Sequence, residues 1–172
     1  MNDKIKIIIE LLEKHISKLE NQGLLHGKMG ISLFLFHLGK KTSNSAYTAL
    51  AEKIVEQVYE DVEKANIAPD FENGLAGIAW GLEHVIQNGF FDGDRDSILS
   101  DLDDKIFQYI TKKDELSIRL QDGLLGYGVY LFSRIQGKAL NQLNDHNYLL
   151  KRLLIEVINR MYDQYEEKEE LS

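Results

Sequence analysis

The fold is decided by a pattern that occurs three times in the chain: LHGKMGISLFL at residues 25–35, ENGLAGIAWGL at residues 72–82 and QDGLLGYGVYL at residues 121–131. Each copy has two glycines three positions apart, followed by a mostly apolar segment. The copies begin about 50 residues apart, the length of one helical hairpin in a repeat protein. Glycine permits a tight entry turn and a close approach between neighbouring helices. The turn glycines are Gly27, Gly30, Gly74, Gly77, Gly123 and Gly126.

The segments between these copies have a different pattern, in which apolar residues recur at steps of three and four among charged residues. This pattern predicts helices with one buried face, whereas the segments after the glycines are apolar nearly all round and should be buried on several sides. We therefore predict one all-α domain over residues 1–172, with seven helices in two layers and the glycine-led helices inside. The predicted stripes of the outer helices are Ile5, Ile8, Ile9, Leu12, Ile16 and Leu19; Tyr47, Leu50, Ala51, Ile54, Val55, Val58 and Val62; Leu99, Leu102, Ile106 and Ile110; and Leu150, Leu153, Leu154, Val157, Ile158 and Met161.

Composition excludes several classes of function. The chain of 172 residues has a formal net charge of −8 and no basic run, which argues against binding to nucleic acid or to an anionic membrane surface. The charged residues within the first fifteen positions interrupt any signal peptide or membrane span, so a cytoplasmic location is expected. The absence of cysteine excludes disulfides, a thiolate nucleophile and cysteine-ligated zinc.

The glycine-led phrases GKMGI (residues 27–31), GLAGIAW (74–80) and GLLGYGVYL (123–131) resemble the repeat signature of the lanthionine synthetase C-like family. Residues 88–94 and 101–106 also resemble its second repeat, so the resemblance covers nearly the whole chain. It implies an α/α toroid, in which an outer ring of helices runs antiparallel to inner helices led by glycine-rich turns. Complete family members carry about seven hairpins, so this chain resembles the N-terminal half of the toroid and forms about three repeats.

The resemblance also implies a chemistry. Family cyclases use zinc, held by two cysteines and a histidine in the later repeats, to activate a peptide thiol for addition to a dehydrated serine or threonine. A chain without cysteine lacks these ligands, so we expect no cofactor and no cyclase activity from this chain alone. We expect instead a peptide-binding or accessory domain, or part of a larger peptide-modification enzyme, with a peptide or protein partner. The open repeat ends favour a homodimer or a partner chain that covers them.

Three polar residues stand directly before the first glycine of each copy: His26, Asn73 and Asp122. If the inner helices start at one mouth, these side chains point toward a common cavity. His26 and Asp122 are then the candidate catalytic residues for proton transfer. The candidate substrate-binding residues around them are Glu72, Asn73, Gln121 and Lys28.

Simpler interpretations compete with these sites. Asn73 and Asp122 suit the N-caps of the following helices, and the connections at residues 41–45 and 141–145 also offer caps. The acidic run at residues 92–97 resembles a calcium loop incompletely, and we favour helix capping by Asp94 or Asp96 there. The histidines have no metal-site spacing, so no metal is expected. Trp80, Tyr127, Tyr130 and Phe132 are expected in the core.

Two other functions remain open at this point. The first is an α/α-barrel protein that acts on carbohydrates, for which Glu72 and Asp122 are the plausible pair of carboxyl groups. The second is a helical-repeat scaffold whose exposed ends recruit a protein, because large exposed apolar patches are rare on monomers.

Overall fold

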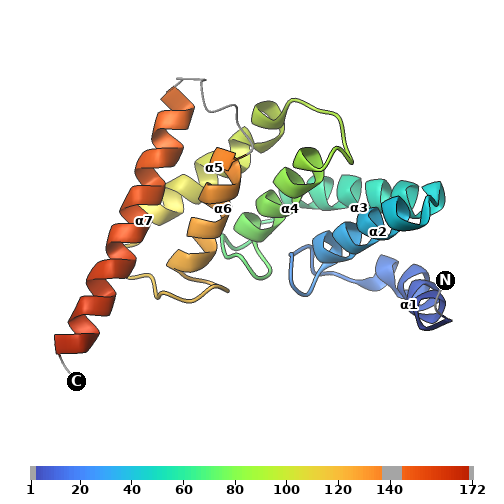
Figure 1. The fold of residues 1–172 in the computed structure, drawn as a ribbon, viewed down its shortest axis with the longest axis horizontal. Helices are drawn as coiled ribbons and strands as arrows, with labels where there is room; N and C mark the ends of the chain where they lie inside the picture. Colours follow the sequence, from blue (N-terminus) through green and yellow to red (C-terminus); the bar gives the residue numbers. More distant parts are fainter. Residues whose placement is uncertain (1–2, 137–144, 171–172) are drawn as a thin grey trace.

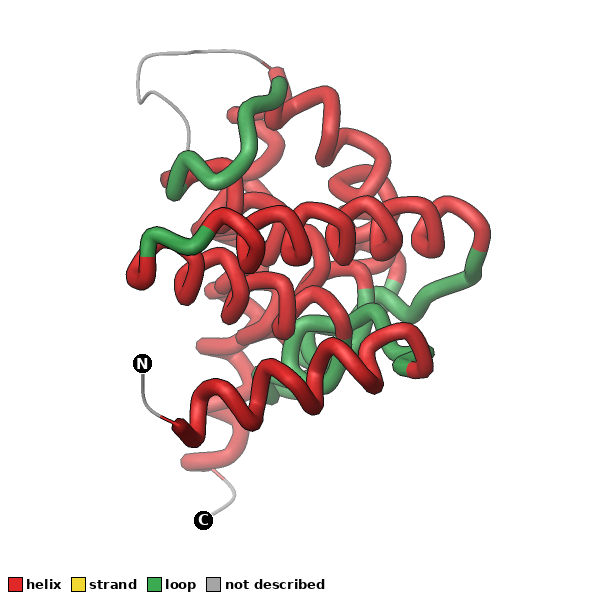
Figure 2. The backbone as a smooth tube through the Cα atoms, turned by 90° about the vertical axis from the view of Figure 1, so that its right-hand side faces the viewer, coloured by secondary structure: helices red, strands yellow, loops and turns green. Residues whose placement is uncertain are grey.

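The computed structural model describes residues 3–136 and 145–170, which contain helices and loops and no strand (Figures 1 and 2). This confirms the prediction of an all-α fold with seven α-helices. None of the helices in the described residues is long and apolar enough to cross a membrane. The elements are α1 (Asp3–His15), a short 3-10 helix η1 (Ile16–Lys18), α2 (Lys28–Thr42), α3 (Ser45–Lys64), α4 (Leu75–Gln87), α5 (Arg95–Lys112), α6 (Leu124–Gln136) and α7 (Asp145–Glu170).

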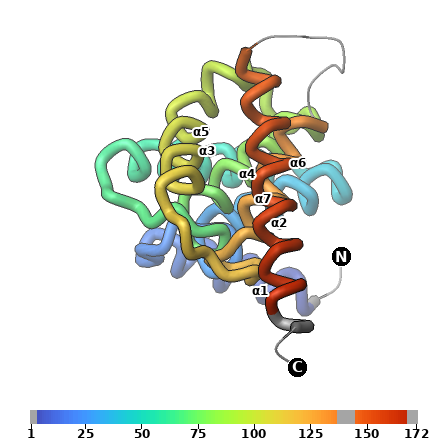
Figure 3. The backbone as a smooth tube through the Cα atoms, turned by 90° about the vertical axis from the view of Figure 1, so that its left-hand side faces the viewer, coloured from blue at the N-terminus to red at the C-terminus, as the bar shows by residue number. Residues whose placement is uncertain are grey.

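The helices form the two predicted layers. The glycine-led helices α2, α4 and α6 pack side by side in one row, and α3 packs on α2, α5 on α4 and α7 on α6 (Figure 1). Figure 3, which views the α7 end, shows α5 and α3 on one side and α6, α4 and α2 on the other. The outer helix of each hairpin therefore covers one side of the inner row.

The three glycine turns have the same backbone geometry. In each turn, the amide after the first glycine donates a hydrogen bond to a carbonyl seven residues earlier: Lys28 to Asn21 at 2.9 Å, Leu75 to Ala68 at 2.8 Å, and Leu124 to Ser117 at 2.8 Å. These bonds fold the chain tightly back onto the start of the inner helix.

The turn glycines are required because the folded-back chain leaves no room for a side chain. A Cβ atom at Gly74 would lie 2.1 Å from the carbonyl oxygen of Ala68, and one at Gly77 would lie 2.0 Å from that of Phe71. The equivalent contacts in the third turn would be 2.2 Å at Gly123 and 2.3 Å at Gly126. The spacing of the two glycines therefore has a steric cause in the turn itself.

Backbone hydrogen bonds also join one turn to the next. Leu25, Glu72 and Gln121 hold the same place in their turns, two residues before the first glycine. The amide of Leu25 donates to the carbonyl of Glu72, and the amide of Glu72 donates to the carbonyl of Gln121, both at 2.9 Å. This ladder fixes the register of the three repeats and aligns their turns along one edge of the molecule (Figure 1).

The predicted stripes are largely buried, and three residues depart from the expectation. Ile54, Leu99 and Leu150, for example, are 1% exposed or less. Ile8 and Ile158 were predicted in buried stripes but are 46% and 53% exposed, and Phe132, predicted in the core, is 52% exposed. These three side chains extend from the solvent face of their helices, where a step of three or four residues does not by itself assign the face.

Capping of the outer helices agrees with the sequence where the structure describes it. The side chain of Asn44 accepts a hydrogen bond from the amide of Ala46 at the start of α3. The side chain of Asp94 accepts one from the amide of Asp96 at the start of α5, as favoured over a calcium loop. The caps expected at residues 141–144 lie outside the described residues.

Two glycine substitutions in the inner helices should differ greatly in their effect on stability. Gly77→Ala is expected to lower the free energy of unfolding by about 2 kcal/mol, because the new methyl group meets a rigid backbone carbonyl. Gly128→Ala serves as the control, since its Cβ would meet only Val157, at 3.5 Å. It should leave stability unchanged or raise it by up to about 1 kcal/mol through helix propensity. Urea denaturation followed by circular dichroism measures both, and equal effects would contradict the argument.

Candidate functional site

The polar residues before the glycines lie along the edge formed by the turns, and they are engaged by specific partners. His26 Nε2 lies 2.8 Å from Glu72 Oε1, which joins the first turn to the second. Asn73 accepts a hydrogen bond from the side chain of Asn21 at 2.7 Å. The carboxylate of Asp122 pairs with Arg119 in its own turn. The two candidate catalytic residues, His26 and Asp122, are therefore held by different partners.

The expectation that Asn73 caps α4 is wrong. The N-cap residue of α4 is Gly74, and it makes no side-chain capping bond. The amide side chain of Asn73 is used across the repeats instead, while the Asp70 carboxylate accepts the backbone N–H of Asn73 at 2.7 Å. A residue directly before the tight turn is thus available for contacts between repeats.

Four of the six candidate residues come together in a polar cleft of about 440 Å³ between the second and third turns. It is lined by Asp70, Glu72, Asn73, Arg119, Gln121 and Asp122. Lys28 is buried elsewhere, and its ammonium group lies 3.4 Å from Asp61 on α3. Glu72 and Asp122, the carboxyl groups of the carbohydrate interpretation, line the same cleft, but Glu72 already contacts His26 and Asp122 is paired with Arg119.

The inner row carries a histidine pair that the sequence reasoning did not connect. His37 and His84 each stand ten residues after the first glycine of their repeat, and their Nε2 atoms are 2.9 Å apart. Trp80 stacks on His84 with ring centroids 5.3 Å apart. Burial and the neighbouring His37 lower the pKa of His84, which favours its neutral form. Because the two histidines occupy equivalent positions in the first and second repeats, their contact could have been predicted from the sequence.

Two ring nitrogens do not make a metal centre. Across residues 3–136 and 145–170, no group of three or more histidine, cysteine, aspartate or glutamate side chains is placed to hold a metal ion. The close contact of His37 and His84 is explained by a hydrogen bond between the two imidazoles, in which one ring donates and the other accepts.

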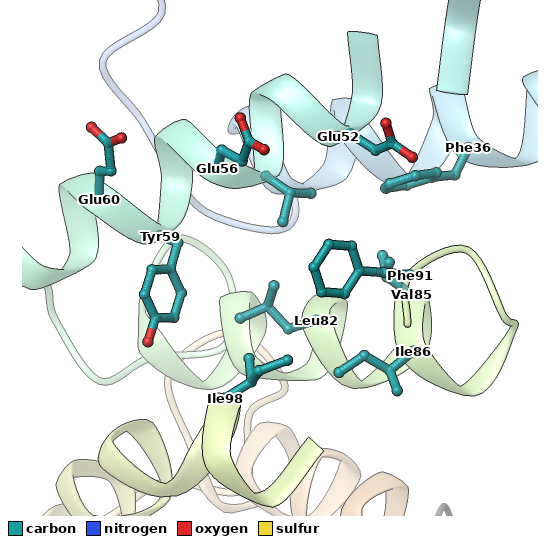
Figure 4. Close-up of a pocket in the computed structure, with 11 residues that line it drawn as sticks. Phe36, Glu52, Glu56, Tyr59, Glu60, Leu82, Val85, Ile86, Phe91 and Ile98 are labelled. Atoms are coloured by element: carbon teal, nitrogen blue, oxygen red, sulfur yellow. The ribbon is translucent and has the colours of Figure 1, made fainter. Parts of the chain in front are cut away.

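A largely apolar groove lies on the outer side of the hairpins. It has a volume of about 490 Å³ and lies between α3 and α4, with Phe91 and Ile98 closing it toward α5. Figure 4 shows apolar side chains facing the gap, among them Leu82 and Tyr59, and three glutamates along α3 whose carboxylates turn away from these apolar side chains. These glutamates are Glu52, Glu56 and Glu60, spaced four residues apart on α3 and exposed.

A buried ionic cluster joins α4, α5 and α6. Arg134 is fully buried, with its guanidinium 3.0 Å from Glu83 on α4 and 2.7 Å from Asp103 on α5. The hydroxyl of Tyr130 donates to Asp103, and His146 on α7 lies 3.0 Å from the same carboxylate. The sequence reasoning missed this cluster because its members are distant in sequence and charged residues are usually exposed.

The electrostatics of the cluster indicate a structural role. Burial alone would raise the pKa of Asp103, but hydrogen bonds from His146, Arg134 and Tyr130 outweigh it and hold that pKa below its ordinary value. Burial and the adjacent Asp103 carboxylate raise the pKa of Tyr130 well above its ordinary value. These residues therefore keep fixed charge states, with Asp103 ionised and Tyr130 neutral, that bind the helices together.

The fold and its repeated glycine turns define an α/α-hairpin repeat protein. Comparison with family models assigns the chain more narrowly, because residues 18–171 match the model described as lanthionine synthetase C-like protein. The chain belongs to the lanthionine synthetase C-like family, as its turn phrases indicated. No curated protein and no solved structure gives a significant match to it.

Removing the central cation of the cluster should be strongly destabilising. Arg134→Met is expected to lower the free energy of unfolding by about 3–5 kcal/mol, because Glu83 and Asp103 stay buried without their main partner. Arg119→Met removes an exposed partner of Asp122 and is the control, for which no measurable change is expected. Chemical denaturation of both variants checks the contrast, and similar losses in the two would contradict a special role for the cluster.

The pKa of Asp103 gives a stability effect with a defined sign. Because its folded value lies below the unfolded value of 3.8, ionised Asp103 stabilises the protein above that pH, and the contribution is lost as pH falls through the folded pKa. The difference in unfolding free energy between the wild type and Asp103→Asn should therefore be constant from about pH 7 to 5 and shrink below about pH 4. Denaturation curves across this range measure it, and a difference that grows in acid would oppose the assignment.

Proposed function

We propose that this protein is a peptide-binding domain of the lanthionine synthetase C-like type, acting as an accessory protein or as one part of a larger peptide-modification enzyme. The groove between α3 and α4 is the observation that supports this proposal. Its volume of about 490 Å³ is in the range typical of ligand sites. Family membership supports the choice of a peptide as the ligand.

The lining of the groove determines the kind of peptide. The floor is apolar, with Leu82 and Val85 from α4 and Ile98 from α5, so it suits aliphatic or aromatic side chains. Tyr59 and Phe91 are 37% and 45% exposed at the groove and offer apolar contact without first being uncovered. The ligand that fits is a peptide segment with apolar residues on one face.

The rim of the groove adds a preference for positive charge. Glu52, Glu56 and Glu60 are separated by one helical turn each, or about 6 Å along α3. Glu60 already contacts Lys64 of the same helix, which leaves Glu52 and Glu56 as the main carboxylates for a ligand. Lysine or arginine residues that flank the apolar face of a peptide complement this rim.

The zinc chemistry of family cyclases does not fit the residues of this chain. The sequence contains no cysteine, so it cannot supply the two thiolate ligands that the resemblance implies. We therefore propose that these residues contribute peptide binding and that any thioether formation takes place outside them.

A designed peptide tests the binding proposal. A fluorescein-labelled amphipathic peptide of leucine and lysine should bind saturably, as measured by fluorescence anisotropy. Phe91→Ala should weaken binding about tenfold by removing an apolar wall of the groove. Glu52→Gln combined with Glu56→Gln should weaken it several-fold and reduce its dependence on salt, since exposed charges act through screened attraction.

Two controls make the result specific to the groove. Glu63→Gln changes an exposed glutamate of α3 that does not line the groove, and it should leave the affinity unchanged. A peptide in which glutamate replaces lysine should bind at least tenfold more weakly. Equal binding of the two peptides, or binding that survives both the Phe91 and the double glutamate variants, would reject the groove as the peptide site.

A further inference from the structure

Helix α7 exposes more large apolar side chains than any other element in the described part of the chain. Six of the fifteen exposed large hydrophobic residues belong to it, whereas the equivalent outer helices α3 and α5 contribute one and none. The six are Tyr148, Leu149, Ile155, Ile158, Tyr162 and Tyr165. α3 and α5 are each followed by another hairpin, whereas α7 is the last helix that the structure describes, so this apolar surface lies on the open side of the third repeat.

Five of these residues lie along one stripe, in which Lys151 occupies the position between Tyr148 and Ile155. Tyr148, Ile155 and Tyr162 are seven residues apart, and Ile158 and Tyr165 follow three positions after the last two. This is the spacing of a two-helix seam. The stripe lies opposite the side that packs on the rest of the protein through Leu150, Leu153 and Val157, which are at most 3% exposed. Figure 3 shows α7 in front of the other helices at this end of the molecule.

Basic and acidic residues lie in opposite halves of α7. Lys151 and Arg152 are exposed in the first half of α7, and Glu166 and Glu167 are exposed in the second half. The hydroxyl of Tyr162 donates to the carboxylate of Glu166, so this carboxylate is held next to the stripe. A second α7 that runs in the opposite direction would bring each basic block against an acidic one, whereas a parallel α7 would bring like charges together.

We propose that two copies of this protein associate through α7, with the two helices antiparallel about a two-fold axis. The register that places Ile155 opposite Ile158 of the partner subunit also places Tyr148 opposite Tyr165 of the partner subunit. The same register sets Arg152 beside Glu166 of the partner subunit, because residues that flank an antiparallel seam pair in this way. With a two-fold axis, each contact occurs twice in the interface. This symmetry is the usual one for homodimers.

The proposal is independent of the peptide groove, which uses α3, α4 and Ile98 and none of α7. It also differs from a head-to-tail contact between α7 and the exposed Ile7, Ile8 and Leu11 of α1. A head-to-tail contact would not be self-complementary and would extend into a ring or filament instead of closing as a dimer.

Light scattering coupled to gel filtration tests the association at tens of micromolar protein. The wild type should have the mass of a dimer, and Ile155→Asp combined with Ile158→Asp should have that of a monomer with unchanged helical circular dichroism. The matched control, Ile7→Asp combined with Leu11→Asp on α1, should remain a dimer. A monomeric wild type, higher polymers, or loss of association in the α1 variant would overturn the proposal.

Charge reversal tests the antiparallel register. Arg152→Glu and Glu166→Arg should each weaken the dimer about tenfold, because each places like charges together at two sites of the interface. The double variant should dimerise like the wild type. An equimolar mixture of the two single variants should also form dimers, since each chain then supplies the charge opposite to its partner. If neither the double variant nor the mixture recovers the dimer, the proposed register is wrong.

Discussion

The arrangement of the protein depends on the contact between the turn glycines and the backbone carbonyls that precede them. Where a Cβ would lie about 2 Å from a carbonyl oxygen, as at Gly74 and Gly77, only glycine allows the chain to fold back onto the helix start. This tight turn brings the residues before it, such as Glu72, to the edge where they bond to the next turn. The row of inner helices follows from these turns, and the outer helices cover it.

The sequence predicted this framework because each part of it has a local cause. The glycine spacing has a steric cause, and the repeat period has the length of a helical hairpin. The apolar stripes of α3, with Ile54, and of α5, with Leu99, face the core. Ile158 was misassigned because the rule of three and four accepts apolar residues on either side of a helix, and Phe132 because the helices after the glycines were expected to be buried on several sides. Where a helix has two apolar sides, as α7 has, the pattern gives the presence of helix but not the face that is buried.

The candidate sites were predictable only in part. The proximity of Glu72 and Asp122 followed from their places one or two residues before the first glycine of neighbouring repeats, but the pairing of His26 with Glu72 needed the register between turns. The buried Arg134 cluster gave no local signal, because its carboxylates come from two other helices and similar residues elsewhere in the chain are exposed. The groove depends on the distance between packed helices, which single-sequence patterns do not encode.

The backbone ladder also orders the local stability of the chain. In a repeat array, each unit is stabilised mainly by its immediate neighbours. The second turn bonds to both of the others through the amide and the carbonyl of Glu72, whereas Leu25 and Gln121 take part in one of these two bonds each. The third turn is held to the second by one bond more than the first, since the carbonyl of Gln121 also accepts a hydrogen bond from the amide of Phe71 at 2.8 Å. Opening is therefore expected to begin at the first turn, with the amide of Leu25 exchanging its hydrogen with solvent faster than that of Glu72. Among the three turns, unravelling thus has a direction, from the first toward the third.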